Sequence, residues 1–119
     1  MSALKECQIH HEARGELDML RLDGAMDSYS FPRLEAALNG LQTAGRNRII
    51  LDCGGLSFIN SAALGSLIGH ARRARENGGD LKLVALPPKI ASIVELLGFD
   101  RILQIFATPA QAEENFTAR

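Results

Sequence analysis

The opening of the chain places apolar residues at a spacing of two, which is typical of β-strands. Residues 16–22 alternate between two faces, and residues 6–13 precede them across a short turn at Gly15. The two segments are therefore predicted to form a hairpin. Gly24 then interrupts the pattern, and we expect the second strand to have ended before it.

Farther along, apolar residues recur every three or four positions, which is the spacing of one buried helix face. The strongest such pattern begins at Asn60 or Ser61 and ends near Glu76, before one Asn and two Gly. A Pro in the first helical turn and a Gly after the last turn mark helix boundaries. The other predicted helices run from near Ser30 to Gly45, from the Pro pair at 87–88 to Gly98, and onward from Thr108.

Three short apolar runs lie between these helices and are predicted to be buried strands. They comprise residues 48–52, 81–86 and 102–106, while residues 53–60 are expected to form a loop. The order of elements is therefore ββαβαβαβα. Strands that alternate with helices indicate crossover connections. The predicted fold is an α/β domain with a central mixed, mostly parallel sheet of about five strands and about four helices.

The length and composition indicate the number of domains and the location of the protein in the cell. With 119 residues the chain has room for one core, so residues 1–119 are expected to form a single domain. No apolar run approaches the roughly 18 residues that cross a membrane. The polar N-terminus also lacks the apolar centre of a secretory signal. We therefore expect a cytoplasmic protein without membrane insertion.

The charge and the chemistry-bearing residues argue against several classes of function. A formal net charge of −1, 5% aromatic residues and no Trp provide neither attraction nor a stacking surface for nucleic acid. The two cysteines, Cys7 and Cys53, are too few and too far apart for a disulfide scaffold or a metal site. No acid–base pair or catalytic triad is visible, so we expect neither an enzyme nor a cofactor.

Three features of the sequence could indicate a functional site, and for each we prefer a structural explanation. The arginines within residues 72–75 are predicted to form a solvated helix face rather than a nucleic-acid site. His70 has no acid or cysteine at a metal-binding spacing, and we expect it at the surface. Cys53 follows a strand but is expected to be a small buried apolar residue, not a nucleophile.

One segment, LDCGGLSFINSAALGSLIG at residues 51–69, resembles the signature of STAS domains, particularly of the bacterial anti-sigma factor antagonists. In that family a strand with an acidic end leads to a loop with an aromatic and an aliphatic residue, and Asp-Ser then opens a helix. Residues 21–27 are similar to the family's Gly-x-x-Asp turn, and residues 77–112 to its closing half. The matching residues are Asp52, Phe58, Ile59, Asn60, Ser61, Ala62, Ala63, Leu64 and Gly65, with Gly24 and Asp27 in the turn.

The resemblance implies a regulatory binding protein. Members of the family bind an anti-sigma factor that is also a serine kinase. Phosphorylation of the serine that matches Ser61 ends the binding, and a serine phosphatase restores it. By the same resemblance, the residues expected to bind the partner are Asp27, Asn60, Ser61, Ala62, Leu64 and Gly65.

The chain departs from the family pattern at two places, and three questions stay open. Ala62-Ala63 replaces Ser/Thr-Gly, and Asn60 replaces Asp, which removes a negative charge beside Ser61. The alternative function is therefore a STAS accessory subunit of a transport or signalling complex that is not phosphorylated. The helix cap is either the Ser61 hydroxyl or the Asn60 carboxamide. Asp27 either contacts a partner or repels the phosphate, or it caps a turn. Asp52 is either a neighbour of the site or a strand-end residue that bonds loop amides, and we prefer the second.

Overall fold

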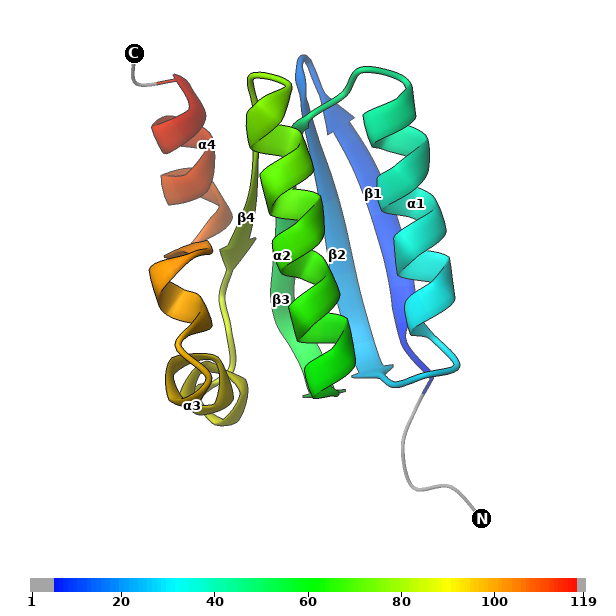
Figure 1. Ribbon diagram of the computed structural model, residues 1–119, viewed down its shortest axis with the longest axis vertical. Coiled ribbons are helices and arrows are strands. Elements are labelled where there is room, and N and C mark those ends of the chain that lie inside the picture. Colours follow the sequence, from blue (N-terminus) through cyan, green and yellow to red (C-terminus); the bar gives the residue numbers. More distant parts are fainter. Residues whose placement is uncertain (1–5, 118–119) are drawn as a thin grey trace.

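The computed structural model describes residues 6–117, and a five-stranded sheet lies at its centre (Figure 1). The strands lie side by side in chain order; β1 pairs antiparallel with β2, and every later pair is parallel. The predicted order of elements and the mixed, mostly parallel sheet are therefore confirmed. The strands are β1 (Gln8–Arg14), β2 (Leu17–Met26), β3 (Arg48–Ile59), β4 (Asp80–Val84) and β5 (Gln104–Phe106). The helices are α1 (Phe31–Thr43), α2 (Ser61–Glu76), α3 (Pro88–Leu96) and α4 (Pro109–Thr117), with a short 3-10 helix, η1 (Phe99–Arg101), after α3.

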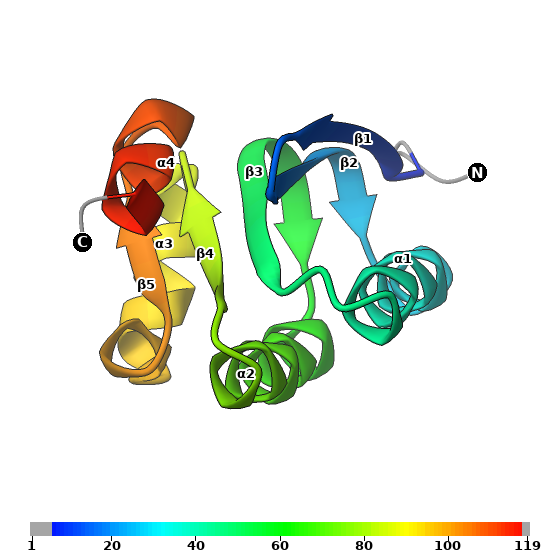
Figure 2. The same ribbon diagram turned by 90° about the horizontal axis from the view of Figure 1, so that it is seen from above.

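Helices cover both faces of the sheet, and the alternation of side chains along the strands explains why. In β3, Ile49 and Leu51 join the apolar cluster that also holds side chains of α1, α2 and α3, whereas Ile50 packs with side chains of α4. Figure 2 shows α4 on the opposite side of the sheet from α1 and α2. A strand that is buried on both faces must be apolar at every position, which accounts for the short apolar runs in the sequence.

The second and third strands are longer than the sequence predicts. β2 continues past Gly24, and β3 runs through most of residues 53–60, so the predicted loop there is wrong. Glycines keep the two strands paired: Gly24 has a φ of 119°, and a Cβ on Gly55 would lie 2.8 Å from the backbone oxygen of Leu22. The glycines that resemble breaks therefore allow two irregular strands to approach closely.

The extra length of β2 and β3 carries both strands to the same end of the sheet. Met26 is the register partner of Ile59, and the backbone N–H of Asn60 donates to the Met26 carbonyl oxygen at 3.3 Å. α1 and α2 begin shortly after these strand ends, at the lower end of the molecule in Figure 1. We call this region, residues 25–31 and 58–65, the carboxyl end of the sheet.

A polar network joins α1 to α2 and corrects one expectation. His70 is buried, with 8% of its surface exposed, and is not a surface residue. Its Nδ1 lies 2.9 Å from Oε1 of Gln42, and its Nε2 lies 3.2 Å from Oε2 of Glu35. Ser66 also donates to Oε2 of Glu35, and this bond is the main cause of the lowered pKa of Glu35. The partners of His70 come from another helix, so its own sequence neighbourhood gives no sign of them.

Candidate functional site

The carboxyl end of the sheet brings together the residues that the sequence singled out. Asp27 follows directly after β2, and Asn60 and Ser61 follow directly after β3. Because the last residues of β2 and β3 are register partners, these residues lie at one end of the molecule (Figure 1). The ends of parallel strands, where helices start, are a common place for binding sites in α/β folds.

Asn60, and not Ser61, caps α2. The backbone of Asn60 is extended, with φ −83° and ψ 162°, and its side chain accepts a hydrogen bond from the backbone N–H of Ala63 at 2.8 Å. Its own carbonyl accepts from the N–H of Leu64 at 3.2 Å, which is the first bond inside the helix. The open choice between two caps is therefore decided in favour of the carboxamide.

Ser61 is the first residue of α2 and its side chain is exposed. Within residues 6–117, no hydrogen bond engages its hydroxyl. The backbone N–H groups of the first helical turn have no carbonyl partner inside the helix, and Asn60 satisfies the one on Ala63. The remaining N–H groups and the helix dipole favour an anion at this position. Ser61 is therefore open to modification, and the fold can accept a negative charge there.

Asp27 acts as a turn cap in this structure. Its Oδ1 accepts hydrogen bonds from the backbone N–H groups of Tyr29 and Ser30, both at 3.0 Å. These bonds stabilise the ionised carboxylate, and the one from Ser30 contributes most to lowering the pKa of Asp27. The turn places α1 at the same end as the start of α2. A contact between Asp27 and a partner stays a prediction.

Asp52 belongs to the strand and not to this site. Its Oδ1 accepts a hydrogen bond from the backbone N–H of Gly54 at 3.0 Å, which agrees with the role expected of it. Asp52 pairs with Val84 in the middle of the sheet, eight residues before Asn60. It therefore supports the local backbone at some distance from Ser61.

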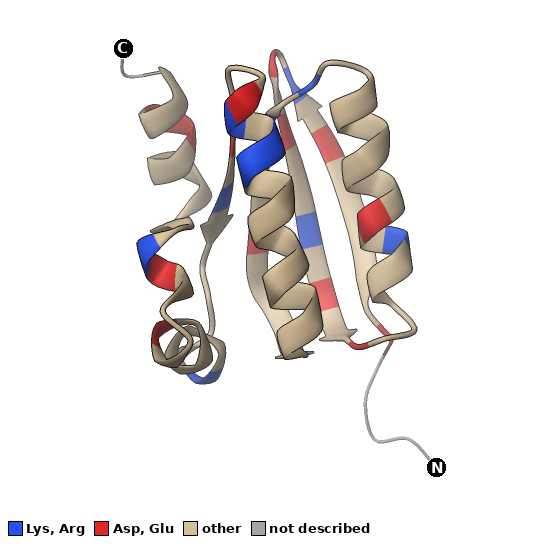
Figure 3. Ribbon diagram, in the orientation of Figure 1, with Lys and Arg blue, Asp and Glu red and all other residues tan. Residues whose placement is uncertain are grey.

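The exposed surface of α2 near Ser61 is small and uncharged. Ala62 and Gly65 are exposed, as a binding surface requires, but Leu64 is 1% exposed. The expectation that Leu64 contacts a partner is therefore wrong, because its side chain packs in the core instead. Figure 3 shows that α2 contains no acidic or basic residue before its last third, which begins at Arg72.

Two exposed aromatic residues lie at the same end, and the predicted set of binding residues omitted them. Tyr29 is 87% exposed and lies in the turn that Asp27 caps. Phe58 is 40% exposed and pairs with Ala25 near the end of β3. Phe58 could have been found from its place in the signature segment, whereas a turn residue such as Tyr29 carries no periodic signal. Exposed aromatic side chains are typical of protein interfaces.

Other chemistry is sparse in the described part of the chain. Residues 6–117 contain no group of three His, Cys, Asp or Glu side chains that could hold a metal ion. Cys7 and Cys53 are both buried, and burial raises the pKa of the Cys53 thiol to about 12. A thiol of that kind is not a nucleophile at neutral pH. None of the helices formed by these residues is long and apolar enough to cross a membrane.

Comparisons with known proteins show a family match over most of the chain. The family described as STAS domain matches residues 8–112. BtrV of Bordetella bronchiseptica, a candidate anti-sigma factor antagonist, is 33% identical over 84 residues, which span 71% of this chain and 72% of BtrV.

Solved structures share the fold. The anti-sigma factor antagonist SpoIIAA in its unphosphorylated form superposes with a TM-score of 0.79 at 21% identity, over 95% of this chain and 97% of that one. The phosphorylated form of SpoIIAA, a cell fate determinant of Bacillus, gives a TM-score of 0.70 at 22% identity, over 92% and 97%. At such identities the solved structures show the shared fold alone. The match of residues 8–112 shows that the chain is related to the STAS domain family.

Proposed function

Since the chain belongs to the STAS domain family, we propose that it is an anti-sigma factor antagonist whose binding is switched by phosphorylation of Ser61. The observation that carries the proposal is the exposed hydroxyl of Ser61 at the start of α2, beside a cap that Asn60 supplies. A kinase can reach this hydroxyl without unfolding the helix. The named relatives and the phosphorylated form of SpoIIAA support the same interpretation.

The fold should survive the modification. A phosphate adds a charge of about −1.5 to −2 at pH 7. At the start of α2 the unpaired N–H groups and the helix dipole favour that charge. Asn60 keeps its bond to Ala63 whether or not Ser61 is modified, because the cap does not use the Ser61 hydroxyl. The switch therefore changes the surface and leaves the scaffold in place.

A docked partner would not tolerate the phosphate. The exposed residues of α2 beside Ser61, Ala62 and Gly65, carry no formal charge, and the Asp27 carboxylate at the same end of the sheet is negative. A partner that packs on this surface must exclude water from it, and a phosphate there would lose its hydration without gaining a cation from α2. Binding by the unmodified protein and release after phosphorylation follow from the same physical cause.

We further propose the partners that such a switch requires. The binding partner is an anti-sigma factor with serine kinase activity, and a serine phosphatase returns the antagonist to its binding form. Both act where sigma factors act, so we place the protein in the cytoplasm. As a binding module the protein needs no cofactor of its own.

Incubation with the cognate anti-sigma factor kinase and ATP, followed by mass spectrometry of the digested protein, tests the proposal. We expect a single added phosphate on Ser61 and none on Ser61→Ala. Thr108→Ala is the matched control, because Thr108 also lies exposed before a helix, where its Oγ1 accepts from the N–H of Gln111. Phosphate elsewhere on the wild type, or none at all, would overturn the assignment of Ser61.

A further inference from the structure

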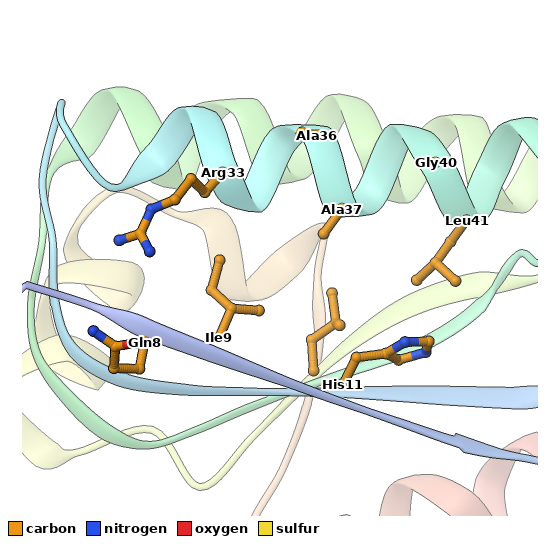
Figure 4. A pocket seen from close by; sticks show the side chains of 9 residues that line it. Gln8, Ile9, His11, Arg33, Ala36, Ala37, Gly40 and Leu41 are labelled. Carbon is orange, nitrogen blue, oxygen red and sulfur yellow. The ribbon is translucent and has the colours of Figure 1, made fainter.

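A groove lies between β1 and α1, and it is separate from the carboxyl end of the sheet. Its volume is about 500 Å³, within the range of small-molecule sites. The lining is mixed: Ile9, Ala37 and Leu41 of β1 and α1 supply apolar side chains above the buried Leu20 of β2, and the polar side chains lie toward the two ends. Figure 4 shows Ile9 and Leu41 directed into the space between the helix and the strand.

The groove is open because α1 carries small residues on the side that lines it. Gly40 lies there, with Ala36 and Ala37 four and three residues before it. A Cβ added to Gly40 would meet no atom within 4 Å outside its own helix backbone, so the packing of the fold does not require glycine at this position. Since glycine is unfavourable in the middle of a helix, its presence widens the groove without any gain for the helix.

Charge is placed unevenly along the groove. Arg33 lies at one end beside Gln8, and His11 lies toward the other end (Figure 4). The Arg33 side chain is 46% exposed; its Nη2 donates to the carbonyl oxygen of Cys7 at 2.7 Å and lies 3.0 Å from Oε1 of Glu6. A guanidinium has five N–H donors in a planar fork, so Arg33 keeps donors for a further acceptor.

The opposite end of the groove is less suited to an anion. The Nε2 of His11 is held 2.7 Å from Oδ1 of Asp18, a carboxylate that is itself buried. The other oxygen of Asp18 accepts from Nε of Arg46 at 2.6 Å. His11 is therefore already engaged with a carboxylate. The anion-accepting group of the groove is Arg33 alone among the residues that line it.

We propose that this groove binds a small carboxylic acid with an apolar body, such as a medium-chain fatty acid. The carboxylate pairs with the Arg33 guanidinium, and the apolar body lies along Ile9, Ala37 and Leu41. The site is independent of phosphorylation at Ser61. Glu6 competes for the same guanidinium and limits the affinity.

Titration of octanoate into the full-length protein, followed by NMR of the ¹⁵N-labelled backbone, tests the proposal, with octanol as the uncharged probe. We expect saturable shifts at residues of β1 and α1, and binding of octanol roughly tenfold weaker because it cannot form the charged pair. Arg33→Gln should remove the preference for octanoate, and Arg33→Lys should retain part of it. Glu6→Gln should tighten the binding of octanoate.

Two controls keep the result specific. Arg48→Gln removes an arginine of similar exposure outside the groove and should change nothing, since the Arg48 side chain is 40% exposed and Arg33 46%. Gly40→Leu fills the groove and should abolish binding of both probes, with thermal unfolding as the check that the variant folds. Shifts that do not saturate, equal binding of octanol and octanoate, or octanoate binding that Gly40→Leu leaves unchanged would each overturn the proposal.

Discussion

The side-chain oxygen of Asn60 accepts a hydrogen bond from the backbone nitrogen of Ala63 at 2.8 Å. This bond lets Ser61 stand at the start of a helix without serving as its cap. A phosphate on Ser61 would therefore leave the capping bond between Asn60 and Ala63 in place. In this chain the two roles are divided between neighbouring residues, and the hydroxyl is left exposed for chemistry.

Asn60 should contribute to stability through its cap. Asn60→Ala removes the acceptor for the Ala63 N–H and is expected to lower the free energy of unfolding by about 1 kcal/mol. Asn60→Asp keeps an acceptor and adds a negative charge that the helix start favours, so it should be at least as stable as the wild type. Urea unfolding followed by circular dichroism measures both. An Asn60→Ala variant as stable as the wild type would show that the cap contributes nothing.

Two glycines should respond in opposite directions to the same substitution. A Cβ on Gly79 would lie 1.9 Å from the carbonyl oxygen of Asn47, which also accepts from the backbone N–H of Asp80 at 2.8 Å. Because backbone would have to move, Gly79→Ala is expected to cost more than about 2 kcal/mol. Gly40→Ala adds a Cβ in open space within a helix and should stabilise by about 1 kcal/mol. Thermal unfolding of the two variants measures both effects. Unfolding temperatures that change in the same direction relative to the wild type would contradict this account.

The turn at Asp27 should make part of the stability depend on pH. The backbone hydrogen bond from Ser30 is the largest cause that lowers the pKa of Asp27 from its ordinary value of 3.8. A carboxyl whose pKa is lower in the folded state stabilises the fold above its ordinary pKa, and it loses this contribution as the pH falls through the folded value. The difference in unfolding free energy between wild type and Asp27→Asn should therefore be constant near neutrality and shrink below about pH 4. A difference in unfolding free energy that grows on acidification would show that folding raises the pKa of Asp27 instead of lowering it.

The two cysteines should be unreactive in the folded protein. Burial raises the pKa of Cys7 and raises that of Cys53 to about 12, so the thiolate fraction at pH 8 is small. Native protein treated with iodoacetamide at pH 8 should remain unmodified at Cys53, whereas protein in urea should be alkylated at both positions. Mass spectrometry reads the result directly. Rapid labelling of Cys53 in the native protein would contradict its burial.

The sequence predicted those features that depend on short spacing. α2 was expected from Asn60 or Ser61 to about Glu76 and spans Ser61–Glu76, because its apolar stripe is regular and glycines follow it. The lengths of β2 and β3 were missed, since Gly24 and Gly55 look like breaks until the neighbouring strand is present. The role of these glycines depends on the close approach of the β2 and β3 backbones, which the neighbouring residues in the sequence do not predict.

Long-range contacts account for most of the other differences. His70 is buried because Gln42 and Glu35 reach it from α1, 28 and 35 residues earlier. The choice of cap could not be made from sequence because Asn and Ser are both good caps; the extended backbone of Asn60 decides it. Leu64 was placed in the binding surface by its position in a motif, although its spacing from Leu67 and Ile68 already indicated the core.

The central claim is that a negative charge at Ser61 ends binding to the anti-sigma factor without disturbing the fold. The most direct measurement is the affinity of that partner for wild type, Ser61→Ala, Ser61→Asp and Thr108→Asp. Thr108→Asp is the matched control, because it adds the same charge before α4, on the other side of the sheet from α2. We expect Ser61→Ala and Thr108→Asp to bind as the wild type does and Ser61→Asp to bind at least about tenfold more weakly. Equal binding by Ser61→Asp and wild type, with phosphorylated wild type also bound, would contradict the account.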